Sequence, residues 1–207
     1  MFGKSRAIVC EMALRANLWI ALTCFLVWGA TSVALSLSGG LARLPAAALL
    51  SWGLVIPPSL FVIFYQRSRK FREFILSLPL RALTLAESPR LLGGSYILWE
   101  LRKGLLPPAF GVITGMTDVL FGLTAVPVAM LMVEPRRQPG RGFFQWHVLS
   151  LLALFVSSLM GIFTSPAGLR TFPASMVPVF LGPLMILIEM AALAQSRART
   201  GDPHLPL

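Results

Sequence analysis

Six ionisable side chains lie inside apolar stretches of this sequence, where a charged group is costly unless it is paired or hydrated. They are Glu87, Arg90, Glu100, Asp118, His147 and Glu189. Such groups can form ion pairs, line a polar pathway or relay protons. Alternatively, they neutralise one another and fix helix packing. These six residues are the candidate binding site or polar interior.

The depths of these residues predict two separate groups. At about 1.5 Å of rise per residue, His147 and Glu189 lie near the cytoplasmic ends of their spans, close to where Glu87 and Arg90 begin a third span. The same arithmetic places Asp118 and the remaining glutamate in the opposite half. Two polar groups at two depths are typical of small carriers and proton relays.

Other site chemistries lack the residues they need. Cys10 and Cys24 have no CxxC spacing. The only histidine besides His147 is His204, near the end of the chain, so haem held by two histidines is not expected. There is no GxSxG motif around Ser157 or its neighbour. The sequence predicts no catalytic residues, no metal and no cofactor.

Long intervals without charge predict the elements that carry these residues. Of 207 residues, 56% are hydrophobic and 13% are charged, whereas a soluble domain has about 25% charged residues. A span needs about 20 apolar residues. We therefore expect an all-α, polytopic transmembrane helical bundle of about six spans that forms one membrane domain, 1–207. The spans are expected near 17–37, 44–65, 84–106, 109–132, 143–163 and 175–195.

The segment 73–106 is the least regular part of the predicted bundle. It begins as an amphipathic segment, near 71–86, and Pro79 and Pro89 predict a break or kink. It is either a polar span or an interfacial helix followed by a short one. The tail, 198–207, has no periodicity and is expected to be short and disordered.

The basic residues predict the orientation. The net charge is +10, and the basic residues stand in short clusters between apolar runs, which does not predict nucleic-acid binding. With six spans, one face of the membrane receives Lys4, Arg6, Arg15, Arg67, Arg69, Lys70, Arg72, Arg136, Arg137, Arg141, Arg197 and Arg199. The opposite face receives only Arg43, Arg102, Lys103 and Arg170. This asymmetry predicts that both termini are cytoplasmic, in a bacterial cytoplasmic (inner) membrane.

Glycines recur in the third and fourth predicted spans, where they let helix backbones approach closely. They are Gly93, Gly94, Gly111, Gly115 and Gly122. Close packing of these two spans is the simplest expectation, and it would bring Arg90, Glu100 and Asp118 toward one interface. Formation of a homo-oligomer through the same glycines is the alternative.

One stretch also resembles a known family. It reads LPLRALTLAESPRLLGGSYILWELRKGLLPPAFGVITGMTDVLFGLTAVPVA. It is similar to an uncharacterised family of small bacterial multi-span membrane proteins with an arginine followed by two apolar residues and a glycine, then a G-L-P-x-x-F turn and a G-x-G-D-like span. The matching places are occupied by Arg90, Gly93, Leu106, Pro107, Phe110, Gly115 and Asp118.

The resemblance covers roughly residues 71 to 196, including Trp146, the Thr164-Ser165-Pro166 turn and the PVFLGPL run from Pro178. The family's Trp-Asn pair is Trp146-His147 here, and an aspartate expected a few residues later is Ala153. The family has no assigned activity, so the resemblance implies a helical bundle and no reaction.

These observations favour a non-enzymatic integral membrane protein. We expect it to bind or pass a small solute, ion or lipid, or to serve as a subunit of a larger membrane assembly, with the lipid bilayer as its partner. The alternative is a membrane-embedded enzyme or redox subunit that acts on a lipid or quinone, with His147 and the glutamates as proton carriers.

Overall fold

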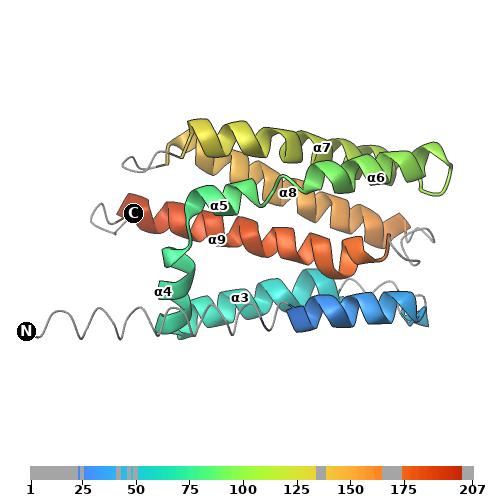
Figure 1. Ribbon diagram of the computed structural model, residues 1–207, viewed down its shortest axis with the longest axis horizontal. Helices are drawn as coiled ribbons and strands as arrows, with labels where there is room; N and C mark the ends of the chain where they lie inside the picture. The colour runs from blue at the N-terminus through green and yellow to red at the C-terminus, as the bar shows by residue number, and fades with distance from the viewer. Residues whose placement is uncertain are drawn as a thin grey trace, which may run out of the picture.

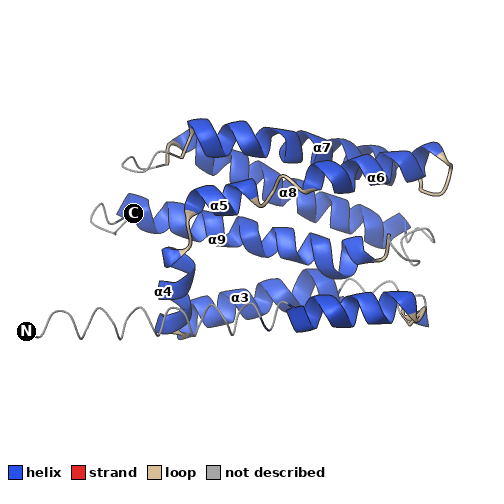
Figure 2. Cartoon of the chain, in the orientation of Figure 1, coloured by secondary structure: helices blue, strands red, loops and turns tan. Residues whose placement is uncertain are grey.

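The computed structural model describes residues 26–40, 43–45, 51–133, 139–164 and 174–201, together with Thr23 and Ala48. Within these residues the chain forms helices joined by turns and loops, and no strand occurs in this part (Figure 2). This confirms the all-α prediction. After a helix at Leu26–Leu37, the elements are η2 (Ser51–Val55), α3 (Ile56–Arg67), α4 (Arg69–Ser77), α5 (Leu80–Leu85), α6 (Arg90–Arg102), α7 (Pro108–Leu131), α8 (Arg141–Thr164), η4 (Val177–Leu181) and α9 (Gly182–Gly201).

The long helices lie side by side along the longest axis of the molecule, and successive ones run in opposite directions (Figure 1). The short α4 lies across this axis at one end. The end of α3, the start of α8 and the end of α9 lie at that same end of the molecule (Figure 1). The loop between α6 and α7 lies at the opposite end.

Three helices of the described part are long and apolar enough to cross a membrane. They are Pro108–Leu131, Arg141–Gly161 and Val177–Ala198, at the places where spans were expected near 109–132, 143–163 and 175–195. The first predicted span, 17–37, lies partly outside the described residues. The second, 44–65, becomes the turn η2 followed by α3. Of the predicted tail, 198–207, the residues up to Gly201 belong to α9, and the rest lies outside the described residues.

The predicted span 84–106 is a broken helix. Residues Ala86–Pro89 form turns between α5 and α6, and Pro89 is the N-cap of α6. Proline has no backbone N–H, so a helix cannot continue through Pro89 with its usual hydrogen bond to Leu85. The predicted break is thus confirmed, and α6 after it is a short helix of 13 residues. Whether 73–106 is a polar span or an interfacial helix followed by a short one stays a prediction.

The helix α4 has one charged face and one apolar face. Ile75 packs in a cluster with Phe61 of α3 and Ala191 of α9, while Arg69 and Lys70 are exposed. At the corner between α3 and α4, Arg72 donates to the carbonyl oxygens of Tyr65 and Gln66 at the end of α3, at 3.2 Å each. These bonds satisfy acceptors that the helix end leaves free. An amphipathic helix that lies across the bundle is suited to the surface of a bilayer.

Glycines bring α6 and α7 into backbone contact. A Cβ atom added at Gly94 would stand 2.6 Å from the carbonyl oxygen of Gly115, and one added at Gly115 would stand 2.7 Å from the side chain of Leu98. Gly122 contacts the backbone of Leu91, and Gly111 faces the side chain of Leu101. Because these glycines are buried within the chain, the described arrangement does not offer them to a second copy.

Gly93 differs from the expectation. An added Cβ atom there would meet no described atom within 4 Å, so Gly93 does not take part in the contact between α6 and α7. Successive residues of a helix point about 100° apart, since a turn holds about 3.6 residues. Only one residue of the Gly93-Gly94 pair can therefore face α7.

Polar and apolar side chains are distributed oppositely to those of a soluble protein. Leu123 of α7 is 61% exposed and Phe163 of α8 is 82% exposed, whereas Glu87, His147 and Glu189 are 0% exposed. In a lipid environment the polar groups must find partners inside the protein, and apolar side chains face outward. The burial pattern fits that environment.

Candidate functional site

Arg90 is the centre of a buried polar network that four elements build. Arg90 is the first residue of α6, so the break in the chain before this helix places its side chain inside the bundle. Its Nε and Nη2 donate to Asp118 Oδ1 of α7 at 3.0 and 2.8 Å. Its Nη1 donates to Glu87 Oε2 at 3.1 Å and to the hydroxyl of Ser150 of α8. The carboxylate of Glu189, from α9, is 3.8 Å from Nη1.

His147 extends the network away from Arg90. Its Nδ1 bonds Glu189 Oε2, and its Nε2 lies 3.4 Å from the hydroxyl of Thr84. Thr84 donates its own hydrogen to the carbonyl oxygen of Leu80, at 3.0 Å, so Nε2 is the donor in the contact with Thr84. The bond between Nδ1 and Glu189 then holds a second proton, on either the nitrogen or the oxygen. His147 and Glu189 together carry no net charge in either arrangement.

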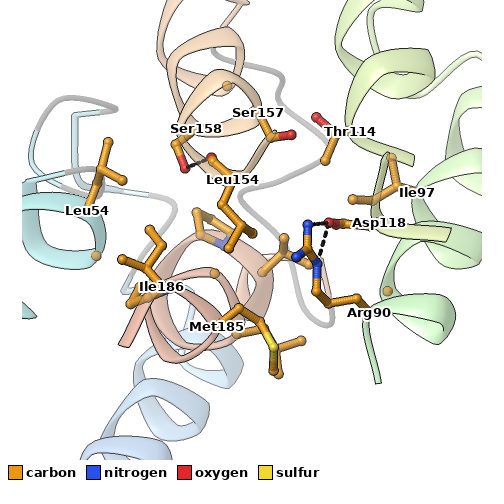
Figure 3. A pocket seen from close by; sticks show the side chains of 18 of the residues that line it. Leu54, Arg90, Ile97, Thr114, Asp118, Leu154, Ser157, Ser158, Met185 and Ile186 are labelled. Carbon is orange, nitrogen blue, oxygen red and sulfur yellow. Dashed lines mark hydrogen bonds and ion pairs between the residues drawn. The ribbon is translucent and has the colours of Figure 1, made fainter. Parts of the chain in front are cut away.

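A cavity of about 100 Å³ adjoins this network. One water molecule requires roughly 10–15 Å³ on such a measure, so the cavity has room for a larger molecule. Its walls are mainly apolar, and Arg90 and Asp118 lie at one side (Figure 3). The lining residues come from η2, α6, α7, α8, η4 and α9, with the exposed Pro89 and Leu181 among them.

Two widened helical turns face the cavity, and each is followed by proline. In η2, before Pro57 and Pro58, the residues that line the cavity are Gly53 and Leu54. In η4, before Pro183, they are Val177, Pro178 and Leu181. A proline ring clashes with the carbonyl group four residues earlier, which disfavours a regular α-helix there. Such π-helical turns are frequent at functional sites.

Two hydroxyl groups in the cavity wall have no hydrogen-bond partner within the described part of the chain. They belong to Thr114 and Ser157, which are 3% and 8% exposed. Hydroxyls elsewhere on the same helices donate to a carbonyl one turn earlier, as Thr117 does at 2.7 Å and Ser158 at 2.8 Å. Figure 3 shows the oxygens of Thr114 and Ser157 directed toward the same space between α7 and α8.

The structure regroups the six residues singled out in the sequence. Asp118, which the depth estimate placed beside Glu100, bonds Arg90, in agreement with the close packing expected for these two spans. Glu100 lies apart from the network, 3.6 Å from Lys103 at the end of α6. The depth estimate erred because it assumed one continuous third span, whereas the chain breaks between α5 and α6, away from both ends of the bundle (Figure 1), and Arg90 is the first residue of α6. One network replaces the two expected groups.

Sequence reasoning missed the neutral polar residues of the site. Ser150 and Ser157 follow His147 at spacings of three and ten residues, which places all three on one face of α8. Thr114 precedes Asp118 by four residues on α7. Helical spacing from the ionisable residues was the signal that would have identified them. Among the described residues, no group of three or more His, Cys, Asp and Glu is arranged to hold a metal ion.

The fold and site define an all-helical protein with three helices of membrane-spanning length around a buried polar network. The chain belongs to a family defined by a domain of unknown function, DUF8737, whose model matches residues 47–197. The match runs from just before η2 to the last turns of α9 and includes every residue of the network. No curated protein and no solved structure matches the chain.

Proposed function

We propose that this protein is a multi-span membrane protein that binds a small molecule in the cavity beside Arg90 and Asp118, without catalysing a reaction. One observation carries the proposal: a buried ion pair and two unpartnered hydroxyls line the same cavity. A dry, closed ion pair with no adjoining space would have favoured a packing role instead. Passage of the bound molecule across the bilayer is the natural extension.

We further propose six crossings of a bacterial cytoplasmic membrane with both termini inside. The support is the alternating direction of the helices and the position of basic α4 and of the ends of α3 and α9 at one end of the bundle (Figure 1). Basic residues gather on the cytoplasmic side of bacterial membrane proteins. The broken segment α5–α6 supplies a crossing with a discontinuity near its middle, a feature that transporters use at their binding sites.

The alternative of a membrane-embedded enzyme or redox subunit that acts on a lipid or quinone has weaker support. It requires His147 or the glutamates to reach a bound molecule. Neither His147, Glu87 nor Glu189 is among the residues that line the cavity, and both ring nitrogens of His147 are already engaged. Binding without chemistry is the better fit.

The proposal predicts that a small reagent can reach the side chains of the cavity wall, and this is tested by cysteine modification. In a chain whose Cys10 and Cys24 are replaced by alanine, Ser157→Cys is compared with Ala129→Cys, which is 0% exposed and lies outside the cavity lining. Methyl methanethiosulfonate, a small uncharged thiol reagent, is added to membrane vesicles and modification is followed by mass spectrometry. We expect rapid modification at Ser157→Cys and little at Ala129→Cys. Equal resistance at both positions would contradict the proposal.

A further inference from the structure

We infer that the cavity takes a monovalent organic cation, a primary ammonium group on a small apolar body, and that its binding displaces one proton from the site to water. The inference rests on the proposed binding function and names the ligand chemistry of that same site. It is carried by three features: the charges of the network, the atoms that face the cavity and the apolar walls.

The charges leave one negative charge without a partner. Around Asp118 the ionisable groups are Arg90 of α6, Glu87 of the preceding turn, His147 of α8 and Glu189 of α9. The His147–Glu189 pair carries no net charge, because one proton is shared between Nδ1 and the carboxylate. Arg90 then faces two carboxylates, Glu87 and Asp118, and compensates only one of them. An excess charge at this depth is costly, so the empty site holds a proton in its place.

The remaining surfaces around the cavity add no ionisable group. Its lining side chains from η2, η4 and α9 in the described part of the chain are apolar residues and glycines. Glu100 lies toward the other end of α6, beside Lys103.

Among the described residues that line the cavity, the polar atoms without a hydrogen-bond partner are oxygens. Both bonds from Arg90 go to Oδ1 of Asp118, and its second oxygen, Oδ2, has no hydrogen-bond partner within the described residues. The hydroxyl oxygens of Thr114 and Ser157 are also unpartnered. An ammonium group donates three hydrogen bonds and accepts none, which matches one carboxylate oxygen and two hydroxyls.

An anionic ligand does not fit this site. Each terminal nitrogen of the Arg90 guanidinium already donates to an oxygen within the network, as does Nε. The guanidinium charge is therefore already shared by Glu87 and Asp118, so an anion would meet the free oxygen of Asp118 without an unpaired cation to compensate it. The walls formed by Ile97, Phe110 and Ile186 favour an apolar body on the ligand rather than a bare metal ion.

The exchange balances in charge and in protons. A protonated amine enters, its N–H groups bond Asp118 and the two hydroxyls, and the proton that had neutralised the carboxylate leaves to water. The network holds the same net charge before and after. By proton linkage, the dissociation constant then falls about tenfold for each unit rise in pH, as long as the empty site keeps its proton and the amine stays protonated.

The test uses the full chain in lipid nanodiscs, with protein-free nanodiscs as the control for partitioning. Isothermal titration calorimetry with 2-phenylethylammonium, and separately with 3-phenylpropanoate, is run between about pH 6 and 8, a range in which the ammonium stays charged. Two buffers of different ionisation enthalpy report the protons released. We expect one ammonium bound per chain, one proton released, and binding that tightens about tenfold per pH unit.

Matched variants assign the binding to these atoms. We expect Asp118→Asn to abolish ammonium binding and Ser157→Ala to weaken it about five- to tenfold, the loss of one hydrogen bond. Ser158→Ala serves as the control, because this neighbouring hydroxyl also lines the cavity but already bonds Leu154. If Asp118→Asn does not fold, the comparison of Ser157→Ala with Ser158→Ala still tests whether these atoms bind the ammonium group.

The possible outcomes separate the two proposals. Tighter binding of 3-phenylpropanoate than of the ammonium overturns the inference about charge and leaves the binding function standing. Ammonium binding that does not change with pH overturns the proton displacement. If neither probe binds, the inference falls, while the binding function is judged separately by modification of Ser157→Cys.

Discussion

Arg90 donates from both Nε and Nη2 to one oxygen of Asp118, at 3.0 and 2.8 Å. This geometry joins α6 to α7 and leaves the second carboxylate oxygen without a hydrogen bond from Arg90, while both residues line the cavity. The same guanidinium also holds Glu87. Arg90 is thus the only arginine or lysine, within the residues that the structure describes, of a network whose carboxylates come from three parts of the chain.

Loss of Arg90 should therefore cost more stability than loss of the Asp118 charge. Arg90→Gln leaves Glu87 and Asp118 buried without a cation, and breaking a buried ion pair costs about 3–5 kcal/mol. Asp118→Asn leaves Arg90 paired with Glu87, and we expect a loss of about 1–2 kcal/mol, close to that of one hydrogen bond. The measurement is the free energy of unfolding of the purified protein in mixed detergent and SDS. Equal losses would mean that Arg90 does not unite the network.

Two neighbouring glycines should respond differently to the same substitution. Gly94→Ala places a methyl group 2.6 Å from the Gly115 carbonyl oxygen, while Gly93→Ala meets no described atom within 4 Å. Forcing a methyl group into a packed contact costs about 1–3 kcal/mol. We expect the melting temperature to fall for Gly94→Ala and to stay near that of the wild type for Gly93→Ala. The reverse order would show that α6 is rotated relative to this structure.

Gln195 of α9 should hold α4 against the bundle. Its Nε2 donates to the carbonyl oxygens of Ile75 and Leu78 at the end of α4, at 2.7 and 2.8 Å. Gln195→Leu removes both bonds and leaves acceptors unsatisfied, at a cost of about 1–3 kcal/mol. We expect faster cleavage by trypsin at the exposed basic residues of α4.

The exposed Gln145 of α8 offers the matched control for that experiment. Gln145→Leu should leave the rate of trypsin cleavage unchanged. If Gln195→Leu also leaves it unchanged, α4 is held by its apolar contacts alone.

The sequence predicts the long helices well because charge-free intervals mark them. The expected span 109–132 compares with α7 at Pro108–Leu131, and 143–163 compares with α8 at Arg141–Thr164. A polar group is costly in lipid, so the absence of charge over about 20 residues is a strong signal. The same argument marks Arg90 and Asp118 as candidate site residues, because both are charged residues within apolar sequence.

The partners of these residues could not be derived in the same way. The contact between Arg90 and Asp118 depends on the residue at which the helix breaks. Pro89 alone does not determine this position, because the turn at 86–89 also contributes to the break. The rotation of each helix about its own axis also decides which side chains meet, as the different surroundings of Gly93 and Gly94 demonstrate. The hydroxyls of Thr114 and Ser157 become candidate ligand contacts only once the cavity is known. Five neighbouring segments of the described chain form this cavity together with α7.

The central claim is that the helices lie across a bilayer with α4 on the cytoplasmic side, and cysteine labelling of the intact protein in bacterial cells tests it most directly. In a chain without Cys10 and Cys24, Lys103→Cys marks the loop after α6 and Arg69→Cys marks α4, where the native side chains are 42% and 90% exposed. A maleimide that cannot cross the cytoplasmic membrane should label Lys103→Cys in intact cells and Arg69→Cys only after the cells are opened. Labelling of both positions in intact cells, or of Arg69→Cys alone, would contradict the proposed arrangement.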